Sequence, residues 1–182
     1  MQNAQRPSGM PIHKYVPFHE QIAVELPDRT WPTKRIEKAP RWCAVDLRDG
    51  NQALIDPMDA ERKLQMFDLL VRTGYREIEV GFPAASSTDF DFVRRLVEDD
   101  LVPEGVTIQV LTQAREELIE RTVQSLAGFS GSALIHLYNS TSTLQREVVF
   151  GLDREGIKDI AVQGARWCAK YAEQHLQGTD VR

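Results

Sequence analysis

Short apolar runs alternate with longer amphipathic stretches through most of this chain. Four of the apolar runs predict buried strands, at about residues 42–47, 77–80, 106–111 and 133–138. The stretches that follow them repeat their apolar residues at about 100° per residue, which is the period of an amphipathic helix. One such helical face consists of Leu64, Phe67, Leu70 and Val71.

Several residues mark where the predicted helices begin and end. Asp56 is a candidate N-cap for the first helix, Pro57 suits its first turn, and Gly74 ends it. The segment 86–89, Ser-Ser-Thr-Asp, supplies cap candidates for the second helix.

The alternation of strands and helices predicts an α/β fold in which helices cover a parallel sheet. The strands recur roughly every 25–35 residues, close to the spacing in a TIM barrel, which has eight βα units in about 250 residues. An open doubly wound sheet has similar spacing, so the pattern alone leaves both architectures open.

The chain holds about four such units, which is half of a closed barrel. A half barrel leaves strand edges unpaired and its interior unfilled. Residues 178–182 resemble the approach to a fifth strand that does not form within the chain. We therefore expect an amino-terminal fragment of a longer protein.

The first 40 residues lack this periodicity. Prolines at positions 11, 17, 27, 32 and 40 prevent any long helix. The large apolar side chains of Tyr15, Phe18 and Trp31 suggest an arm that lies across another surface. The predicted organisation is therefore an arm of residues 1–40 followed by a partial barrel domain, residues 41–182.

The composition excludes several classes of protein. The 182 residues are 42% hydrophobic and 27% charged, which is typical of globular domains. A net charge of −5 argues against a nucleic-acid-binding protein. No apolar run approaches the roughly 20 residues that span a membrane, and the first residues do not resemble a secretory signal. Cys43 and Cys168, placed in a strand and on the core face of the last helix, are expected to be buried free thiols in a reducing cytoplasm.

Polar side chains gather where the predicted strands end, which is where barrel enzymes carry their catalytic groups. They are Arg48, Asp49 and Gln52 after the first strand, Glu79 at the second and His136 in the fourth. Arg48 can hold a carbonyl or carboxylate through its planar guanidinium, and Asp49 can bind a hard divalent cation. Taken alone, these residues are equally compatible with structural roles. The loop that carries Arg48 and Asp49 could hold a surface salt bridge, and Glu79 could pair with Arg48. His136 could be a hydrogen-bonded core residue.

Two longer motifs narrow the interpretation. Residues 47–52 (Leu-Arg-Asp-Gly-Asn-Gln) and 75–86 (Tyr-Arg-Glu-Ile-Glu-Val-Gly-Phe-Pro-Ala-Ala-Ser) together closely resemble the 2-isopropylmalate synthases. These are metal-dependent Claisen-condensing enzymes built on a TIM barrel. The resemblance extends from about Pro11 to Arg182, and the leader resembles that of the longer subtype. The Arg-Asp-Gly core by itself indicates only the wider superfamily.

The resemblance implies an acyltransferase that condenses acetyl-CoA with 3-methyl-2-oxobutanoate to 2-isopropylmalate, the committed step of leucine synthesis. It implies that Asp49 is a ligand of Mg²⁺ or Mn²⁺ and that Arg48 stabilises the oxygen on which negative charge develops. Gln52, His136 and Glu79 are implied to bind the keto acid. A cytoplasmic homodimer is implied for the full-length protein.

Other features of that family are missing from the sequence. They are a His-x-His pair and an Asn that complete the metal site, a catalytic Glu on the fifth strand, and a leucine-binding domain. We therefore expect the chain alone to bind metal weakly and to be inactive. Two alternatives stay open: a citramalate or homocitrate synthase, because Arg48 and Asp49 serve the shared chemical step, and a non-catalytic half barrel that acts as an interaction module.

Overall fold

The computed structural model describes residues 9–22, 26–28 and 38–182. The chain divides into a smaller unit, Gln5–Arg41, and a larger unit that contains Trp42–Arg182. Whether these units act as an arm and a barrel domain stays a prediction.

The smaller unit has two short helical segments in its described part. A 3₁₀ turn spans Ile12–Lys14, and helix α1, Phe18–Gln21, begins directly after Pro17. The side chains of Tyr15 and Phe18 are largely exposed. Trp31, the third predicted contact residue of the arm, lies outside the described residues.

The larger unit is built on a five-stranded parallel sheet. Its strands are β1 (Cys43–Ala44), β2 (Glu77–Gly81), β3 (Thr107–Gln113), β4 (Ser132–Tyr138) and β5 (Asp180–Val181). They pair in the order β1-β2-β3-β4-β5, each parallel to the next. A doubly wound sheet reverses its strand order at a switch point, whereas a barrel adds strands in sequence. The sheet therefore confirms the predicted α/β fold and is consistent with a partial TIM barrel.

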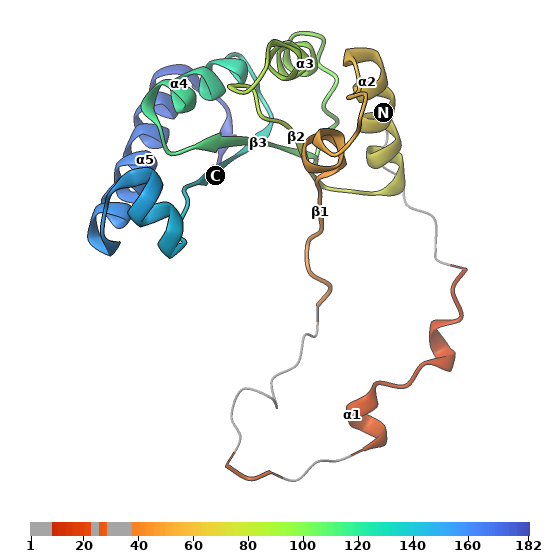
Figure 1. Cartoon of the computed structure of the whole chain (residues 1–182). Coiled ribbons are helices and arrows are strands. Elements are labelled where there is room, and N and C mark those ends of the chain that lie inside the picture. Colours follow the sequence, from red (N-terminus) through yellow and green to blue (C-terminus); the bar gives the residue numbers. More distant parts are fainter. Residues whose placement is uncertain (1–8, 23–25, 29–37) are drawn as a thin grey trace. The chain divides into compact units, whose positions relative to one another are not determined.

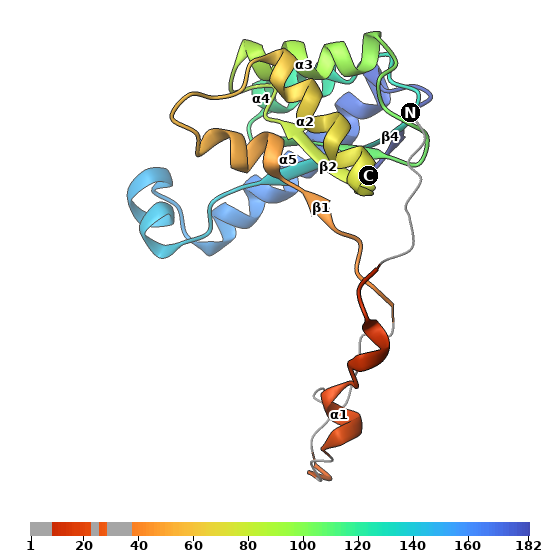
Figure 2. The same cartoon turned by 90° about the vertical axis from the view of Figure 1, so that its right-hand side faces the viewer.

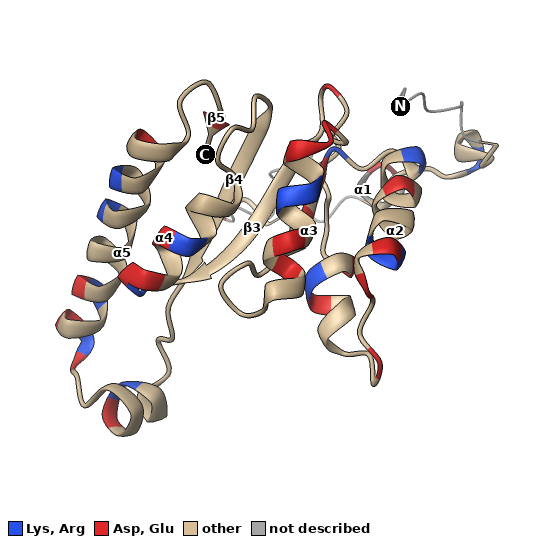
Figure 3. Cartoon of the chain, turned by 90° about the horizontal axis from the view of Figure 1, so that it is seen from above, with Lys and Arg blue, Asp and Glu red and all other residues tan. Residues whose placement is uncertain are grey.

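Four helices follow the strands: α2 (Ala60–Thr73), α3 (Ser87–Glu98), α4 (Glu116–Ser125) and α5 (Arg154–His175). They form an arc on one side of the strands (Figures 1 and 2). Charged residues recur along these helices (Figure 3), and most of them are exposed or half-buried, as the amphipathic pattern predicts. Their apolar faces pack on the sheet, where Phe67, Val71 and Phe92 join Ile78 and Val80 in the buried core.

The two faces of the sheet differ in polarity because successive strand residues point to opposite sides. Ile78 and Ile108 belong to the core beneath the helices. The residues that flank them point to the other face, where Glu79 and Gln109 are hydrogen-bonded to each other. This polar inner face carries the candidate site.

Three predictions about the elements are wrong in detail. Residues 180–181 do form a fifth strand, with Ser132 paired to Asp180 and Ala133 paired to Val181. The first strand is shorter than expected, because one π-helical turn, Asp46–Gly50, takes over where the strand was predicted to continue. In that turn the N–H of Gly50 bonds the carbonyl of Val45, five residues earlier, at 3.1 Å.

The start of the first long helix also differs from the prediction. Asp59, not Asp56, is the N-cap of α2, and its Oδ1 accepts from the N–H of Arg62 at 2.8 Å. The residues just before Asp59 are held in the loop by a hydrogen bond from the N–H of Met58 to the side chain of Asn51, at 2.7 Å.

The other helix boundaries agree with the sequence. Gly74 ends α2 in the left-handed conformation, with φ 110°, and its N–H bonds the carbonyls of Leu70 and Val71. Ser86 caps α3 through a hydrogen bond from the N–H of Asp89 at 3.1 Å.

Both cysteines are free thiols in the predicted elements, β1 and α5, and both are half-buried. Burial raises the pKa of the Cys168 thiol to about 11. In the described part of the chain, no helix has the length and apolar character needed to cross a membrane.

Candidate functional site

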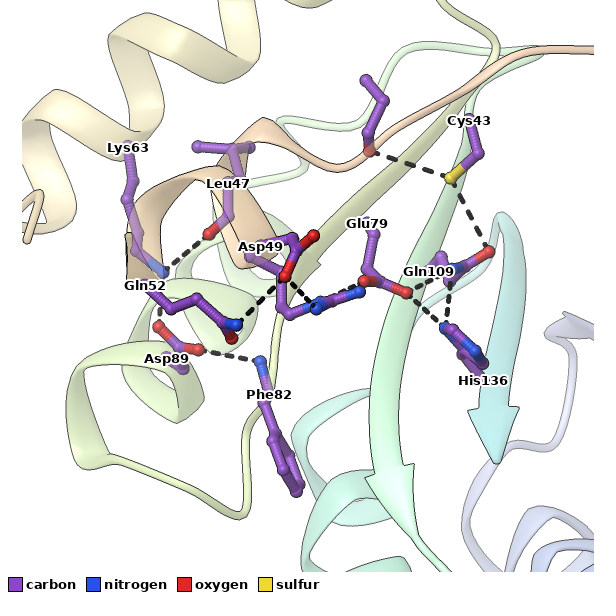
Figure 4. Close-up of polar contacts among 12 residues, drawn as sticks. Cys43, Leu47, Asp49, Gln52, Lys63, Glu79, Phe82, Asp89, Gln109 and His136 are labelled. Atoms are coloured by element: carbon purple, nitrogen blue, oxygen red, sulfur yellow. Dashed lines mark hydrogen bonds and ion pairs between the residues drawn. The ribbon is translucent and has the colours of Figure 1, made fainter. Parts of the chain in front are cut away.

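The five residues predicted to carry the chemistry lie in one continuous series of side-chain contacts. The series runs from Gln52 through Asp49, Arg48 and Glu79 to His136 (Figure 4). It crosses the sheet from the turn after β1 to β4 and connects residues that are far apart in the sequence. The structure thus brings all five together, while their chemical roles stay predictions.

Glu79 is the centre of this series. Its side chain is 0% exposed. Its Oε1 accepts from Nε of Arg48, and its Oε2 lies 2.6 Å from Nδ1 of His136. Oε2 also accepts from Nε2 of Gln109 on the intervening strand β3. Both carboxylate oxygens are therefore held by side chains from three different elements.

Asp49 lies on the exposed side of the series, between Gln52 and Arg48. Its Oδ1 accepts from Nη1 of Arg48 at 2.8 Å and from Nε2 of Gln52 at 3.0 Å. The Asp49 side chain is 54% exposed, whereas that of Arg48 is 17% exposed. The guanidinium thus lies between a buried carboxylate and a solvent-facing one.

The π-helical turn explains how neighbouring residues reach such different environments. The N–H groups of Arg48, Asp49 and Gly50 all bond the carbonyl of Val45, at 3.2, 2.8 and 3.1 Å. Leu47 anchors the turn in the core with 0% exposure. Single π-helical turns are rare and occur frequently at functional sites. This turn directs Arg48 towards β2 and leaves Asp49 at the surface.

The environment of Glu79 favours its charged form. Burial by itself raises the pKa of this carboxyl. Hydrogen bonds with His136, Gln109 and Arg48, together with the positive charge of Arg48, outweigh burial and hold the pKa below its ordinary value. An anionic Glu79 fixes the guanidinium of Arg48 on one side and the imidazole of His136 on the other.

Cys43 lies at the edge of this network. Its Sγ is 3.7 Å from Oε1 of Gln109. Burial, followed by the negative charge of Glu79, raises the pKa of the Cys43 thiol. A thiol with a raised pKa is a poor nucleophile at neutral pH.

A cleft of about 740 Å³ opens beside Arg48 and Gln52. Its walls come from the loop before α2, including Met58, and from the segment between β2 and α3, including Phe82 and Ser86. The cleft has the size of a small-ligand site.

Asp49, the residue predicted to bind a metal ion, has the chemistry that a hard divalent ion needs. Asp49 has a solvent-facing carboxylate, the oxygen donor that Mg²⁺ and Mn²⁺ prefer. Among residues 9–22, 26–28 and 38–182, no group of three or more His, Cys, Asp or Glu side chains is placed to hold a metal ion. Asp49 thus fits one position in a coordination sphere whose other positions need further donors.

Three polar residues of this region were missed by the sequence analysis. Gln109 interrupts an apolar strand as His136 does, and its alternation with Ile108 and Val110 could have revealed it. Lys63 and Asp89 form an ion pair between α2 and α3, in which Lys63 is fully buried and the Asp89 side chain is 15% exposed. No sequence signal marks that pair, because both residues sit on helices that already have a polar face.

Comparison with known proteins defines the class of this fold and site. Residues 39–180 match the family described as HMGL-like. The chain belongs to the HMGL-like family.

Individual relatives have a more specific name. The chain is 76% identical, over 178 residues, to a 2-isopropylmalate synthase of Parafrankia sp. (strain EAN1pec). It is 72% identical, over 173 residues, to one of Arthrobacter sp. (strain FB24), and 69% identical, over 181 residues, to one of Kineococcus radiotolerans. The predicted resemblance to 2-isopropylmalate synthases is confirmed.

The matches cover this chain almost completely but cover the relatives only in part. They include 98%, 95% and 100% of this chain, and 31%, 30% and 31% of the three relatives. The chain therefore spans about a third of the length of the curated relatives that it matches.

Proposed function

We propose that this chain contributes part of the active site of a 2-isopropylmalate synthase, which condenses acetyl-CoA with 3-methyl-2-oxobutanoate and releases CoA. The observation that carries the proposal is the continuous series Gln52–Asp49–Arg48–Glu79–His136. It occurs in a chain that is 76% identical to a protein of that name. The reaction belongs to leucine biosynthesis.

Arg48 is proposed to stabilise the ketone oxygen as it becomes an alkoxide. Its Nε is bonded to Glu79 and its Nη1 to Asp49. A guanidinium has five N–H donors, so donors remain for a substrate oxygen at the open side. Because the group is already oriented, it does not have to reorganise as charge develops.

Asp49 is proposed to supply one ligand of a divalent ion, Mg²⁺ or Mn²⁺. Such an ion, when bound, polarises the ketone oxygen as a Lewis acid. In this proposal, donors beyond the described residues complete the site. The hydrogen bond from Gln52 fixes Oδ1 of Asp49 at 3.0 Å and thereby orients the carboxylate.

His136 and Gln52 are proposed to position the keto acid. In this proposal Nδ1 of His136 carries the imidazole proton and donates it to the carboxylate of Glu79, 2.6 Å away. Nε2 is then available to the substrate side. Glu79 acts in this proposal through Arg48 and His136, because both of its oxygens are occupied.

The resemblance also supports a homodimer and a cytoplasmic location for the longer protein. We propose both on that basis. Light scattering of the longer protein would test the first, and a monomer at micromolar concentration would contradict it.

The test of the function is a hybrid enzyme, in which this chain replaces the matching segment of the Parafrankia synthase. The 76% identity over 178 residues makes such an exchange practical. Release of CoA thiol would be measured with 3-methyl-2-oxobutanoate, pyruvate and 2-oxoglutarate, with the unmodified Parafrankia enzyme as control. We expect the highest kcat/KM with 3-methyl-2-oxobutanoate. Preference for pyruvate or 2-oxoglutarate would instead favour a sister synthase, and a folded but inactive hybrid would favour the non-catalytic alternative.

A further inference from the structure

A lysine is fully buried behind the candidate site. Lys63 of α2 has a side-chain exposure of 0% and pairs with Asp89 of α3. Its Nζ also lies 3.4 Å from the carbonyl oxygen of Leu47 and 5.5 Å from the centroid of the Phe92 ring. Burying an ammonium group carries a large desolvation cost, and a buried ion pair is often no more stable than apolar residues of similar size. The stability of the fold therefore does not by itself explain why this ion pair is present.

Both partners of this pair also bind backbone next to the site (Figure 4). Leu47, whose carbonyl faces Lys63, directly precedes Arg48 in the π-helical turn. Asp89 accepts through Oδ2 from the N–H of Phe82 at 2.7 Å, directly beyond the end of β2. The ion pair thus joins the turn that carries Arg48 to the strand that carries Glu79.

The position of Asp89 is tightly constrained. A Cβ added to Gly81 would lie 3.0 Å from Oδ2 of Asp89, so a larger residue at that point of β2 would push the carboxylate out of place. Asp89 occupies the third residue of α3, where an acidic side chain commonly returns to its own N-cap. Here its carboxylate turns instead to Lys63 and Phe82.

We infer that Lys63, held by Asp89, is a positioning residue that fixes the Asp46–Gly50 turn and so presents Arg48 and Asp49 to the substrate. The inference rests on the proposed function for its catalytic consequence. Its structural part, the fixing of the turn, stands independently. Small displacements of a catalytic group far from the mutated atom can lower rates by about 100-fold.

The first arm of the test measures the turn itself. Hydrogen exchange of the amides of residues 46–50 would be compared in the 182-residue chain and its Lys63→Met variant. Methionine keeps the length of the side chain and removes its charge. We expect these amides to exchange at least about ten-fold faster in the variant, because the Leu47 carbonyl loses its cation and local opening becomes easier.

The matched control is Arg94→Met. Arg94 is a helix cation whose side chain is 23% exposed, and it donates to the carbonyls of Ser125 and Ala127, at 3.3 and 2.6 Å, while pairing with Glu98. These contacts are made away from the Arg48 turn. We expect this variant to leave exchange at residues 46–50 unchanged. Equal acceleration in both variants, or none in Lys63→Met, overturns the inference.

The second arm measures kinetics in the hybrid enzyme. We expect Lys63→Met to lower kcat/KM for the keto acid by between about ten-fold and 100-fold, whereas Arg94→Met leaves it within two-fold at a temperature where both are folded. An inactive parent hybrid contradicts the proposed function, while the hydrogen-exchange arm still decides the role of Lys63.

If Lys63→Met does not fold, the Asp89→Asn variant replaces it, because the amide oxygen of asparagine still accepts from the N–H of Phe82. Unchanged exchange at residues 46–50 in that variant overturns the inference.

Discussion

Oε2 of Glu79 and Nδ1 of His136 lie 2.6 Å apart, although 57 residues separate them in the sequence. They belong to β2 and β4, which are not neighbours, and Gln109 of the intervening strand β3 donates to the same Oε2. The imidazole is therefore oriented by a carboxylate that is itself fixed by Arg48. This arrangement leads to the predictions that follow.

Replacing Glu79 by Gln should destabilise the chain in a pH-dependent way. The pKa of Glu79 is lowered from 4.5 in the folded chain, so its stabilisation is complete above that pH and is lost as the pH falls through the lowered pKa. We expect Glu79→Gln to reduce the free energy of unfolding by about 3 kcal/mol at pH 7, and by progressively less below pH 4.5.

Urea unfolding of the 182-residue chain and the variant, between pH 7 and pH 3, would measure this difference. The control is Glu98→Gln, which removes an exposed carboxylate paired with Arg94 and should have an effect near zero. A difference between wild type and Glu79→Gln that stays constant down to pH 3 would contradict the assignment.

The two nitrogens of His136 should have separable roles. Asparagine places an amide nitrogen near the position of Nδ1, and glutamine places one near the position of Nε2. We expect His136→Asn in the hybrid enzyme to keep its unfolding temperature but to lose about 100-fold in kcat/KM. His136→Gln should be less stable, because it loses the contact with Glu79. Thermal unfolding and keto-acid kinetics of the two variants would check this prediction. If both variants lost the same factor in kcat/KM and were equally stable, Nε2 would not contact the substrate.

The carboxylate charge of Asp49 should be required for metal binding. Asp49→Asn keeps an oxygen that can accept from Arg48 and Gln52 but removes the anionic ligand. We expect its affinity for Mn²⁺ to fall by at least about ten-fold in the hybrid enzyme, as measured by calorimetry. Asp99→Asn, which removes an exposed carboxylate near Arg95, is the matched control. Unchanged Mn²⁺ affinity in Asp49→Asn would rule out Asp49 as a ligand.

Gly164 of α5 should not tolerate a methyl group. An added Cβ would lie 2.9 Å from Cβ of Ala114 and 3.2 Å from Cδ2 of Leu137. The Ala114 atom is attached directly to backbone and has little freedom to move. Overpacking of this kind costs about 1–3 kcal/mol, whereas alanine gains only about 1 kcal/mol over glycine in helix propensity.

We therefore expect Gly164→Ala to lower the free energy of unfolding by about 1 kcal/mol. Urea unfolding would measure it. The control is Ala169→Gly, at an exposed position of the same helix. It measures the effect of helix propensity alone on the free energy of unfolding. A stabilised Gly164→Ala variant would show that α5 can shift away from Ala114.

The sequence by itself determined the kinds of elements and the edge of the sheet that carries the chemistry. The period of the apolar residues distinguishes strands from helices, and parallel strands all end at one edge. That is why Arg48, Asp49, Gln52, Glu79 and His136 could be grouped before their contacts were known. The specific motifs around Arg48 and Glu79 then indicated the family.

Tertiary structure decided the strand order, the turn after β1 and the buried partners of the site. Strand order depends on pairings between distant segments, such as Glu79 with Gln109, which local periodicity does not record. The loop before the helix start at Asp59 is held by a hydrogen bond from Met58 to the side chain of Asn51. Lys63 is charged and lies on an amphipathic helix, so local sequence places it at the surface. It is buried because a carboxylate 26 residues away, on another helix, compensates its charge, and only the folded chain brings those two groups together.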